Sequence, residues 1–343
     1  VYMPMADTSP PAVETSFEEL GLSPWLVGAC GELGLRRPTP IQAHCIGPAL
    51  AGKDVLGSAE TGSGKTAAFV LPMLETLSAD PFGVFSLILS PARELASQIA
   101  DQVSALGAPM GVKVATIVGG HDMMKQALQL AQRPHVVVGT PGRLVDHLRS
   151  TEAAAAVRRL RMLIIDEADR LLELGFHDDV AAILSYLPKQ RQTLLFSATM
   201  SGALQRLQQL ALRAPFVADL AAAEGVAARL EQQYVFVPAN VRDAYLAYLL
   251  REQQAEGATA LVFTATCRAC ETLACMLRAL GVECEALHSQ QPQARRLAAI
   301  GRFKQGSLRL LIATDVASRG LDIPQVGVVF NHNVPAAPRD YIH

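Results

Sequence analysis

Long apolar runs are the first thing that this sequence lacks. No run reaches the ~18 residues that a membrane-spanning helix needs, so we expect no membrane span. The first seven residues show neither the basic nor the apolar segment of a secretory signal peptide. Charged residues are also scarce, at 18%, whereas half of the 343 residues are apolar. This composition excludes a disordered chain and predicts a packed protein with room for two domains of ~150 residues each.

An excess of either charge sign is missing too. The 30 Lys and Arg residues are balanced by 32 Asp and Glu residues, which leaves a net charge of −2. A uniformly basic surface for nucleic acid is therefore excluded. Any nucleic acid must be held by a local cleft, through a few arginines and backbone amides, and the charge alone neither supports nor excludes such a partner.

Cysteines are few, and their spacing shows no disulfide framework, which favours a reducing intracellular compartment. Cys267, Cys270 and Cys275 follow an apolar strand and fall on a predicted helix, and Cys284 falls on the next strand. A structural zinc site needs four convergent ligands. We therefore expect buried free thiols, with zinc as the weaker alternative.

Short apolar strands alternate with amphipathic helices, such as 67–77 and 93–106, along the whole chain. This alternation is typical of βα units that build parallel sheets. A first series of strands is predicted at 54–57, 85–90, 112–118, 135–139, 162–166 and 192–197. A second series is predicted at 232–237, 260–263, 283–287, 308–313 and 327–330.

An Ala-rich stretch without a strand pattern separates the two series. We predict an α/β protein with a disordered extension at 1–14, a first domain at 15–216, a linker at 217–230 and a second domain at 231–343. The alternative is one large sheet, with the stretch as a surface helix.

The segment Ala59–Thr66 is typical of a phosphate-binding loop, because it follows a strand, opens a helix and contains Gly62, Gly64 and Lys65. Its backbone N–H groups would hold phosphates, Lys65 would reach the β and γ oxygens, and the hydroxyl of Thr66 can ligate Mg²⁺. The strict pattern has Gly where this chain has Ala59.

Asp166 and Glu167 follow the strand 162–165 and complement this loop. Asp166 would hold Mg²⁺, partly through water, and Glu167 would orient and deprotonate an attacking water. Alone, the two acids could simply favour the positive end of a helix. Together with the loop they predict hydrolysis of a nucleoside triphosphate, with Lys65, Asp166 and Glu167 as the catalytic residues.

The run Asp166-Glu167-Ala168-Asp169 resembles the motif that gives the DEAD-box ATP-dependent RNA helicases their name, and further motifs of that family follow in order from Phe17 to His343. The resemblance implies two tandem RecA-like domains, each a mostly parallel sheet flanked by helices, with the second one incomplete. It also implies ATP and Mg²⁺ as cofactors.

The resemblance assigns nucleotide-binding roles. The segment Pro38–Gln42 matches the adenine-recognising motif, and the amide of Gln42 can pair with the N6/N7 edge of adenine. Phe17 matches an aromatic that stacks on the base, although an ordinary core residue is the alternative. The complete nucleotide-binding set is Phe17, Gln42, Ala59, Thr61, Gly62, Ser63, Gly64, Lys65, Thr66, Gly320 and Asp322.

It also assigns contacts with RNA. The expected set is Arg93, Gly120, Thr140, Arg143, Arg296 and Thr314. Glycines such as Gly120 let a sugar–phosphate backbone approach peptide N–H groups. Ala92 stands where the family usually has Thr, so one polar contact with RNA is missing. Residues expected to couple hydrolysis to strand separation, including between domains, are Asp169, Ser197, Thr199, Asp315 and Arg319.

The family continues beyond a His like His343 into an arginine-rich motif that stabilises the transition state. Two further interpretations follow. In the first, the chain as given is a hydrolysis-deficient clamp for ATP and RNA. In the second it is a DNA helicase, but Gln42 and the run Asp166-Glu167-Ala168-Asp169 argue against that alternative.

Several stretches, among them Val328–Asn333, resemble the nucleolar subgroup that assists small-subunit ribosome assembly. This implies a nuclear and nucleolar monomer that acts on single-stranded or short duplex RNA, including pre-rRNA, with assembly-factor proteins as possible partners.

Overall fold

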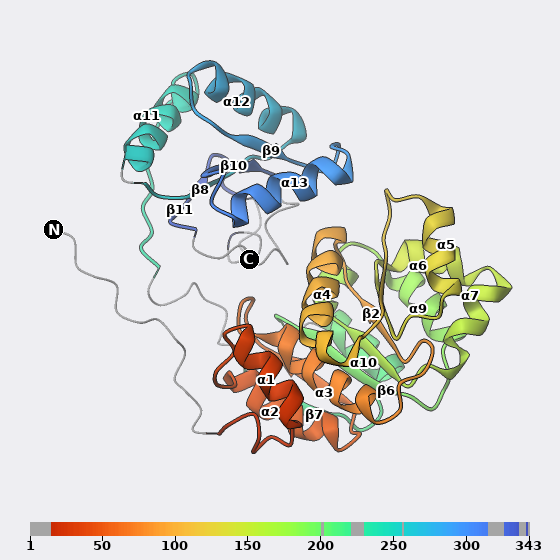
Figure 1. Cartoon of the computed structure of the whole chain (residues 1–343). Coiled ribbons are helices and arrows are strands. Elements are labelled where there is room, and N and C mark those ends of the chain that lie inside the picture. The colour runs from red at the N-terminus through yellow and green to blue at the C-terminus, as the bar shows by residue number, and fades with distance from the viewer. Residues whose placement is uncertain are drawn as a thin grey trace. The chain divides into compact units, whose positions relative to one another are not determined.

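The structure is a computed structural model, and it describes residues 15–199, 202–220, 230–255, 257–314, 326–335 and 341. The chain divides into two compact units, Val1–Ala223 and Glu224–His343 (Figure 1). Each unit has its own parallel sheet, so the alternative of one large sheet is wrong. The predicted extension at 1–14 lies outside the described residues.

The first unit contains a seven-stranded sheet in the order β3-β4-β2-β5-β6-β1-β7, and every neighbouring pair is parallel. The strands are β1 (Val55–Ser58), β2 (Ser86–Leu89), β3 (Val114–Ile117), β4 (Val136–Gly139), β5 (Met162–Ile165), β6 (Gln192–Ser197) and β7 (Phe216–Asp219). The six strands predicted for this half are confirmed within about two residues at each end.

Helices cover both faces of this sheet (Figure 1). They are α1 (Pro24–Glu32), α2 (Pro40–Leu50), α3 (Lys65–Ala79), α4 (Arg93–Leu106), α5 (Met123–Ala131), α6 (Pro141–Leu148), α7 (Thr151–Ala156), α8 (Ala168–Glu173), α9 (His177–Tyr186) and α10 (Gly202–Ala211), with short 3₁₀ turns η1 (Ala108–Met110) and η2 (Val157–Arg159). The helix predicted at 93–106 matches α4, and the one predicted at 67–77 lies inside α3.

The strands of this sheet are apolar on both faces because each face is buried by helices. Along β5, Met162 and Ile164 pack into the cluster beneath α1 to α4, whereas Leu163 and Ile165 pack into the cluster on the opposite face. The same alternation runs along β6. The continuous apolar runs of the sequence therefore arise from a sheet sandwiched between two helical layers.

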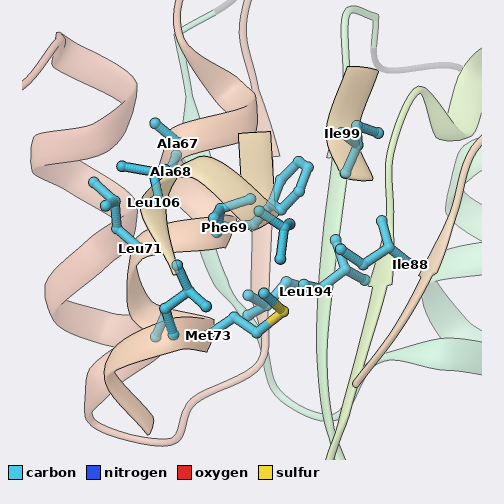
Figure 2. Close-up of a cluster of buried hydrophobic side chains, with 14 of the residues drawn as sticks. Ala67, Ala68, Phe69, Leu71, Met73, Ile88, Ile99, Leu106 and Leu194 are labelled. Atoms are coloured by element: carbon cyan, nitrogen blue, oxygen red, sulfur yellow. The ribbon is translucent and has the colours of Figure 1, made fainter. Parts of the chain in front are cut away.

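Figure 2 shows Phe69 and Met73 of α3 pointing toward Ile88 and Leu194 of the sheet. The Phe69 ring lies 5.4 Å from the ring of Phe196. A side chain at Gly57 of β1 would meet that second ring, because a Cβ there would lie 2.5 Å from its nearest ring carbon. Gly57 thus leaves the room that Phe196 occupies.

The second unit contains a four-stranded parallel sheet in the order β11-β8-β10-β9. Its elements are α11 (Arg242–Ala255), β8 (Ala260–Phe263), α12 (Cys267–Ala279), β9 (Glu285–Leu287), α13 (Gln293–Lys304), β10 (Leu310–Ala313) and β11 (Val328–Asn331). Helices α11 and α12 pack on one face and α13 on the other.

Two sequence predictions need correction. Residues 217–219, predicted as linker, belong to β7, whose backbone pairs with β1 at the edge of the first sheet. The strand predicted at 232–237 is wrong, since these residues lie in no helix or strand. Its alternating apolar residues are exposed, Tyr234 to 95% and Phe236 to 96%, because no described strand pairs with this segment.

The cysteines follow the prediction in part. Cys267, Cys270 and Cys275 lie on α12, and Cys284 immediately precedes β9. All four are free thiols, but only Cys270 and Cys284 are buried, whereas Cys275 is exposed and Cys267 is partly exposed. Burial raises the pKa of both buried thiols to about 11.

Among the described helices, none combines the length and the apolar character that crossing a membrane would require.

Candidate active site

The loop that the sequence predicts to bind phosphates, residues 59–66, lies between the end of β1 and the start of α3, and we call it the phosphate loop. Gly62 and Gly64 have φ angles of +81° and +90°, a backbone conformation that glycine adopts without strain. The loop therefore turns so that its N–H groups open onto the N-terminus of α3, where phosphates bind. Lys65 is buried, and its Nζ donates a hydrogen bond of 2.7 Å to the carbonyl of Ala59. This contact holds the lysine across the loop.

Gln42 lies directly against this loop. Its Nε2 donates to the carbonyl of Gly64 (3.0 Å), and its Oε1 accepts from the N–H of Thr39 (3.0 Å). The side chain is 2% exposed. Each end of the amide makes one bond, so each retains capacity for one more. The structure thus connects the predicted base-recognising residue to the phosphate loop, and its contact with adenine stays a prediction.

Asp166 and Glu167 lie at the carboxyl end of β5, where open α/β sheets place their ligands. Asp166 is 3% exposed, and its Oδ1 accepts from the N–H of Glu167 (3.0 Å). Glu167 has a left-handed φ of +47° at the start of α8, which is uncommon for a residue with a side chain. Its Oε2 is buried without a hydrogen-bond partner in the described structure. An unpaired buried oxygen of this kind is free to accept a proton or a hydrogen bond from a ligand.

The two carboxyl groups are electrostatically coupled to each other and to Lys65. Burial raises the pKa of Asp166 to about 6, and the charge of Lys65 opposes this rise. Burial, followed by the charge of Asp166, raises the pKa of Glu167 to about 7. A carboxyl group whose pKa lies near 7 is well matched to general base catalysis at neutral pH.

Asp169 joins this site to the end of β6. Its Oδ2 accepts from both the Oγ1 (3.0 Å) and the N–H (3.1 Å) of Thr199. The Oγ of Ser197 donates to the carbonyl of Thr199 (2.8 Å), and the carbonyl of Ser197 accepts from the N–H of Ala59 in the phosphate loop (3.1 Å). A continuous set of hydrogen bonds therefore runs from the acidic motif through Ser197 and Thr199 to the phosphate loop.

The RNA-contact residues predicted in the first unit also gather at the carboxyl ends of the strands. Arg93 opens α4, and its guanidinium lies beside Gly119. Gly120 has a φ of +80°. Thr140 precedes α6, and Arg143 on that helix donates to the carbonyl of His121 (2.8 Å). Helix N-termini, the exposed Gly120 and two arginines thus share one edge of the sheet.

In the second unit, Thr314 directly follows β10 and is 3% exposed, with a hydroxyl that has no partner among the described residues. Arg296 lies on α13 and is 6% exposed. The predicted Asp315, Arg319, Gly320 and Asp322 lie outside the described residues.

Phe17 lies in the hydrophobic core, 2% exposed, in the cluster that includes Leu22 and Leu26. This placement corresponds to the core alternative, and its stacking on a base stays a prediction. The sequence-based predictions missed the role of Thr39 as the N-cap of α2, where its backbone N–H donates to the side chain of Gln42. The spacing Thr-x-x-Gln at the start of α2 is the signal that would have found it.

Comparisons with known proteins agree with this geometry. Residues 39–207 match the family model described as DEAD/DEAH box helicase, and residues 242–343 match the model described as Helicase conserved C-terminal domain. The human protein named "Probable ATP-dependent RNA helicase DDX49" is 53% identical over 332 residues, covering 95% of this chain and 68% of the relative. "DEAD-box ATP-dependent RNA helicase 36" of Arabidopsis thaliana is 46% identical over 342 residues, covering 99% of this chain and 69% of the relative.

Among the solved structures that this chain resembles are two that contain RNA and a nucleotide. S. cerevisiae Dbp5 bound to RNA and ADP BeF3 has a TM-score of 0.85 at 27% identity, covering 96% of this chain and 84% of that one. Mss116p bound to ssRNA and AMP-PNP has a TM-score of 0.87 at 28% identity, covering 100% of this chain and 73% of that one.

Proposed function

The chain belongs to the DEAD/DEAH box helicase family, and on that premise we propose that it is an RNA-dependent ATPase that opens short RNA duplexes or removes proteins from RNA. The observation that carries the proposal is the buried pair Asp166 and Glu167 beside Lys65, joined through Asp169 to Thr199.

The residues fit ATP and Mg²⁺. The left-handed glycines Gly62 and Gly64 shape a loop for phosphates, and Lys65 is the cation that would contact them. The hydroxyl of Thr66 and the carboxylate of Asp166 are oxygen ligands of the kind that Mg²⁺ prefers. Bound there, the metal would neutralise charge on the phosphates.

Glu167 has the features of the base. Its Oε2 is buried and makes no hydrogen bond within the described residues, and its raised pKa places proton acceptance near neutral pH. Asp166 fixes the backbone of Glu167 by accepting its N–H. The carboxylate would orient a water molecule and accept its proton.

The contact between Asp169 and Thr199 couples ATP hydrolysis to strand separation. Because Ser197 also bonds the phosphate loop through its carbonyl, a change at the phosphates can reach the segment after β6. The positions of Arg93, Gly120, Thr140 and Arg143 support binding of an RNA backbone, through phosphates and 2′-hydroxyls and with little sequence preference. Arg296 and Thr314 are proposed to add contacts from the second unit.

We extend the proposal to a first domain from residue 15 through β7 to Asp219, to a second domain at 231–343, to a monomer, and to a role in rRNA processing within the nucleolus. This part rests on the resemblance to the ribosome-assembly subgroup alone, with pre-rRNA as the RNA and assembly factors as protein partners.

The test is ATP turnover with and without single-stranded RNA. RNA is expected to stimulate turnover in the protein and not in a Glu167→Gln variant that still binds ATP. DNA of the same length is expected to stimulate poorly. Turnover that RNA leaves unchanged would refute the proposal, and equal stimulation by DNA would favour the DNA-helicase alternative.

A further inference from the structure

Basic residues collect at the edge of the first sheet that lies opposite the phosphate loop. They precede six of its seven strands, namely all except β2, and we call them the basal rim. The basal rim consists of Lys53, Lys113, Arg133, Arg158, Arg159, Arg161, Lys189, Arg191 and Arg213. Two acidic residues lie on the same edge, Asp54 before β1 and Asp80 before β2. A chain with a net charge of −2 thus concentrates an excess of about seven positive charges along one edge.

Backbone hydrogen bonds connect these segments to each other. The N–H of His135 donates to the carbonyl of Lys113, and the N–H of Phe85 donates to the carbonyl of His135. Farther along, the N–H of Gln192 donates to the carbonyl of Arg161. Since neighbouring strands lie ~4.8 Å apart, the seven strands spread the basal rim over roughly 29 Å.

Helix dipoles account for part of this charge only. Six helices of nine or more residues in the first unit, α2, α3, α4, α5, α9 and α10, end in the connections that lead to strands on this edge. Each helix C-terminus is equivalent to about half a negative charge, so together they offset roughly three positive charges. About four of the seven positive charges are therefore not offset by the helix C-termini. Cations that serve only to cap helices would leave no such excess.

A cavity of about 310 Å³ opens within the basal rim. Lys189, Arg191, Thr193 and Arg213 line it, together with Asp54. The carboxylate of Asp54 accepts the backbone N–H groups of Thr193 (2.8 Å) and Arg213 (2.7 Å), so it is tied to the backbone and offsets one of the three cations.

Two donors in this cavity lack partners. The hydroxyl of Thr193 is on a side chain that is only 1% exposed, and it makes no hydrogen bond within the described structure. The Nε of Arg191 is buried and equally unbonded among these residues. Burial and the charge of Arg213 lower the pKa of the Arg191 guanidinium, against the opposing effect of Asp54. An oxyanion would satisfy both donors and remove the repulsion between the arginines.

We infer that the basal rim binds the sugar–phosphate backbone of RNA, with one phosphate seated in the cavity between Lys189 and Arg213. The inference rests on the proposed function in taking RNA as the polymer. A regularly charged polyanion fits a row of cations that extends over roughly 29 Å. The centre of a protein interface, by contrast, is depleted of charged residues. The basal rim would hold RNA that flanks the segment bound at the opposite edge.

The test compares RNA affinities of the whole protein for a short oligonucleotide of about ten nucleotides and a long one of about 40, over a series of salt concentrations. The variant is Lys189→Gln/Arg213→Gln, because both side chains are exposed. Its affinity for long RNA is expected to fall on the order of tenfold at low salt, and its salt slope by ~0.7, the value for the one phosphate contact that is lost. Its affinity for short RNA stays unchanged.

The matched control is Arg206→Gln, which removes an exposed cation on α10 that lies off the basal rim. Arg206→Gln should leave the affinity for long RNA intact, whereas the single variant Arg213→Gln should lower it. Equal losses in the two single variants, or equal affinity of the native protein and the double variant for long RNA, would overturn the inference. So would a double variant that loses only binding to a Glu-rich peptide, since that result assigns the basal rim to an acidic protein.

ATP turnover separates this inference from the proposed function. Short RNA should stimulate turnover equally in the native protein and in the Lys189→Gln/Arg213→Gln variant. Absence of stimulation in the native protein counts against the proposed function, whereas binding of long RNA decides the basal rim.

Discussion

Replacing Glu167 by Gln is expected to stabilise the first unit more at high pH than at low pH. Burial and the neighbouring Asp166 hold the folded-state pKa of Glu167 at about 7, against 4.5 for an ordinary glutamate. A raised pKa means that the folded state binds a proton that the unfolded state releases. The stability that this proton contributes is therefore fully present below the unfolded pKa of 4.5 and is lost as the pH rises through 7.

The magnitude follows from the two pKa values. At ~1.4 kcal/mol for each pKa unit, the negative charge of Glu167 costs the fold roughly 3 kcal/mol at pH 8.5 but only about 1 kcal/mol at pH 5. Gln carries no charge, so the variant escapes this loss. Its amide needs its own hydrogen bonds, which shifts the stability by a constant ~1 kcal/mol at every pH. The pH-dependent part, about 2 to 3 kcal/mol, is the signal.

Urea denaturation at pH 5 and pH 8.5 measures this difference. The single tryptophan of the chain, Trp25, lies on α1 against the core of the first unit, so its fluorescence reports that unit. A difference of 2 to 3 kcal/mol shifts the urea midpoint on the order of 1 M. Glu60→Gln, at an exposed position in the phosphate loop, is the control and should show no pH-dependent gain. A gain for Glu167→Gln that is equal at both pH values would refute the electrostatic account of the site.

Three further outcomes are expected. ATP turnover should fall as the pH drops through about 7, because Glu167 must be ionised to accept a proton; a flat profile from pH 6 to 8 would contradict its role. Thr199→Ala should lower duplex opening more than ATP turnover, because it removes the hydroxyl bond to Asp169, and Thr199→Ser should restore the opening; equal losses of both activities would contradict the coupling. Gly57→Ala should cost ~1–3 kcal/mol of stability by overpacking against Phe196, and Phe196→Leu in the same chain should recover part of it in a denaturant titration; additive losses would show that the two residues do not collide.

The sequence predicts most of the first sheet because its strands are short apolar runs buried on both faces, a pattern that helices rarely imitate at this length. It misses β7 because Phe216–Asp219 carries its apolar residues beside an Ala-rich stretch, and only pairing with β1 makes it a strand. It wrongly predicts a strand at 232–237, since alternation alone cannot supply a neighbouring backbone. A strand needs an alternating apolar pattern and also a neighbouring strand whose backbone it can pair with. Only the neighbouring strand depends on the tertiary structure.

The candidate site shows the same division. Local motifs place Lys65, Asp166 and Glu167 correctly at strand and helix ends, because loop chemistry and strand ends are local. The contact of Gln42 with Gly64 joins residues 22 positions apart, and the bonds of Asp169 to Thr199 join residues 30 positions apart. Such contacts depend on the order of strands in the sheet, which no local pattern contains.

The hydrogen bonds from the acidic motif through Asp169 and Thr199 to the phosphate loop imply that ATP binding and RNA binding favour the same state of this protein. The most direct measurement is the affinity of the Glu167→Gln variant for a short single-stranded RNA, with saturating ATP and without nucleotide, together with its affinity for ATP with and without that RNA. The account predicts that ATP tightens RNA binding and that RNA tightens ATP binding by the same factor, as linkage requires. RNA affinity that is the same with and without ATP would contradict it.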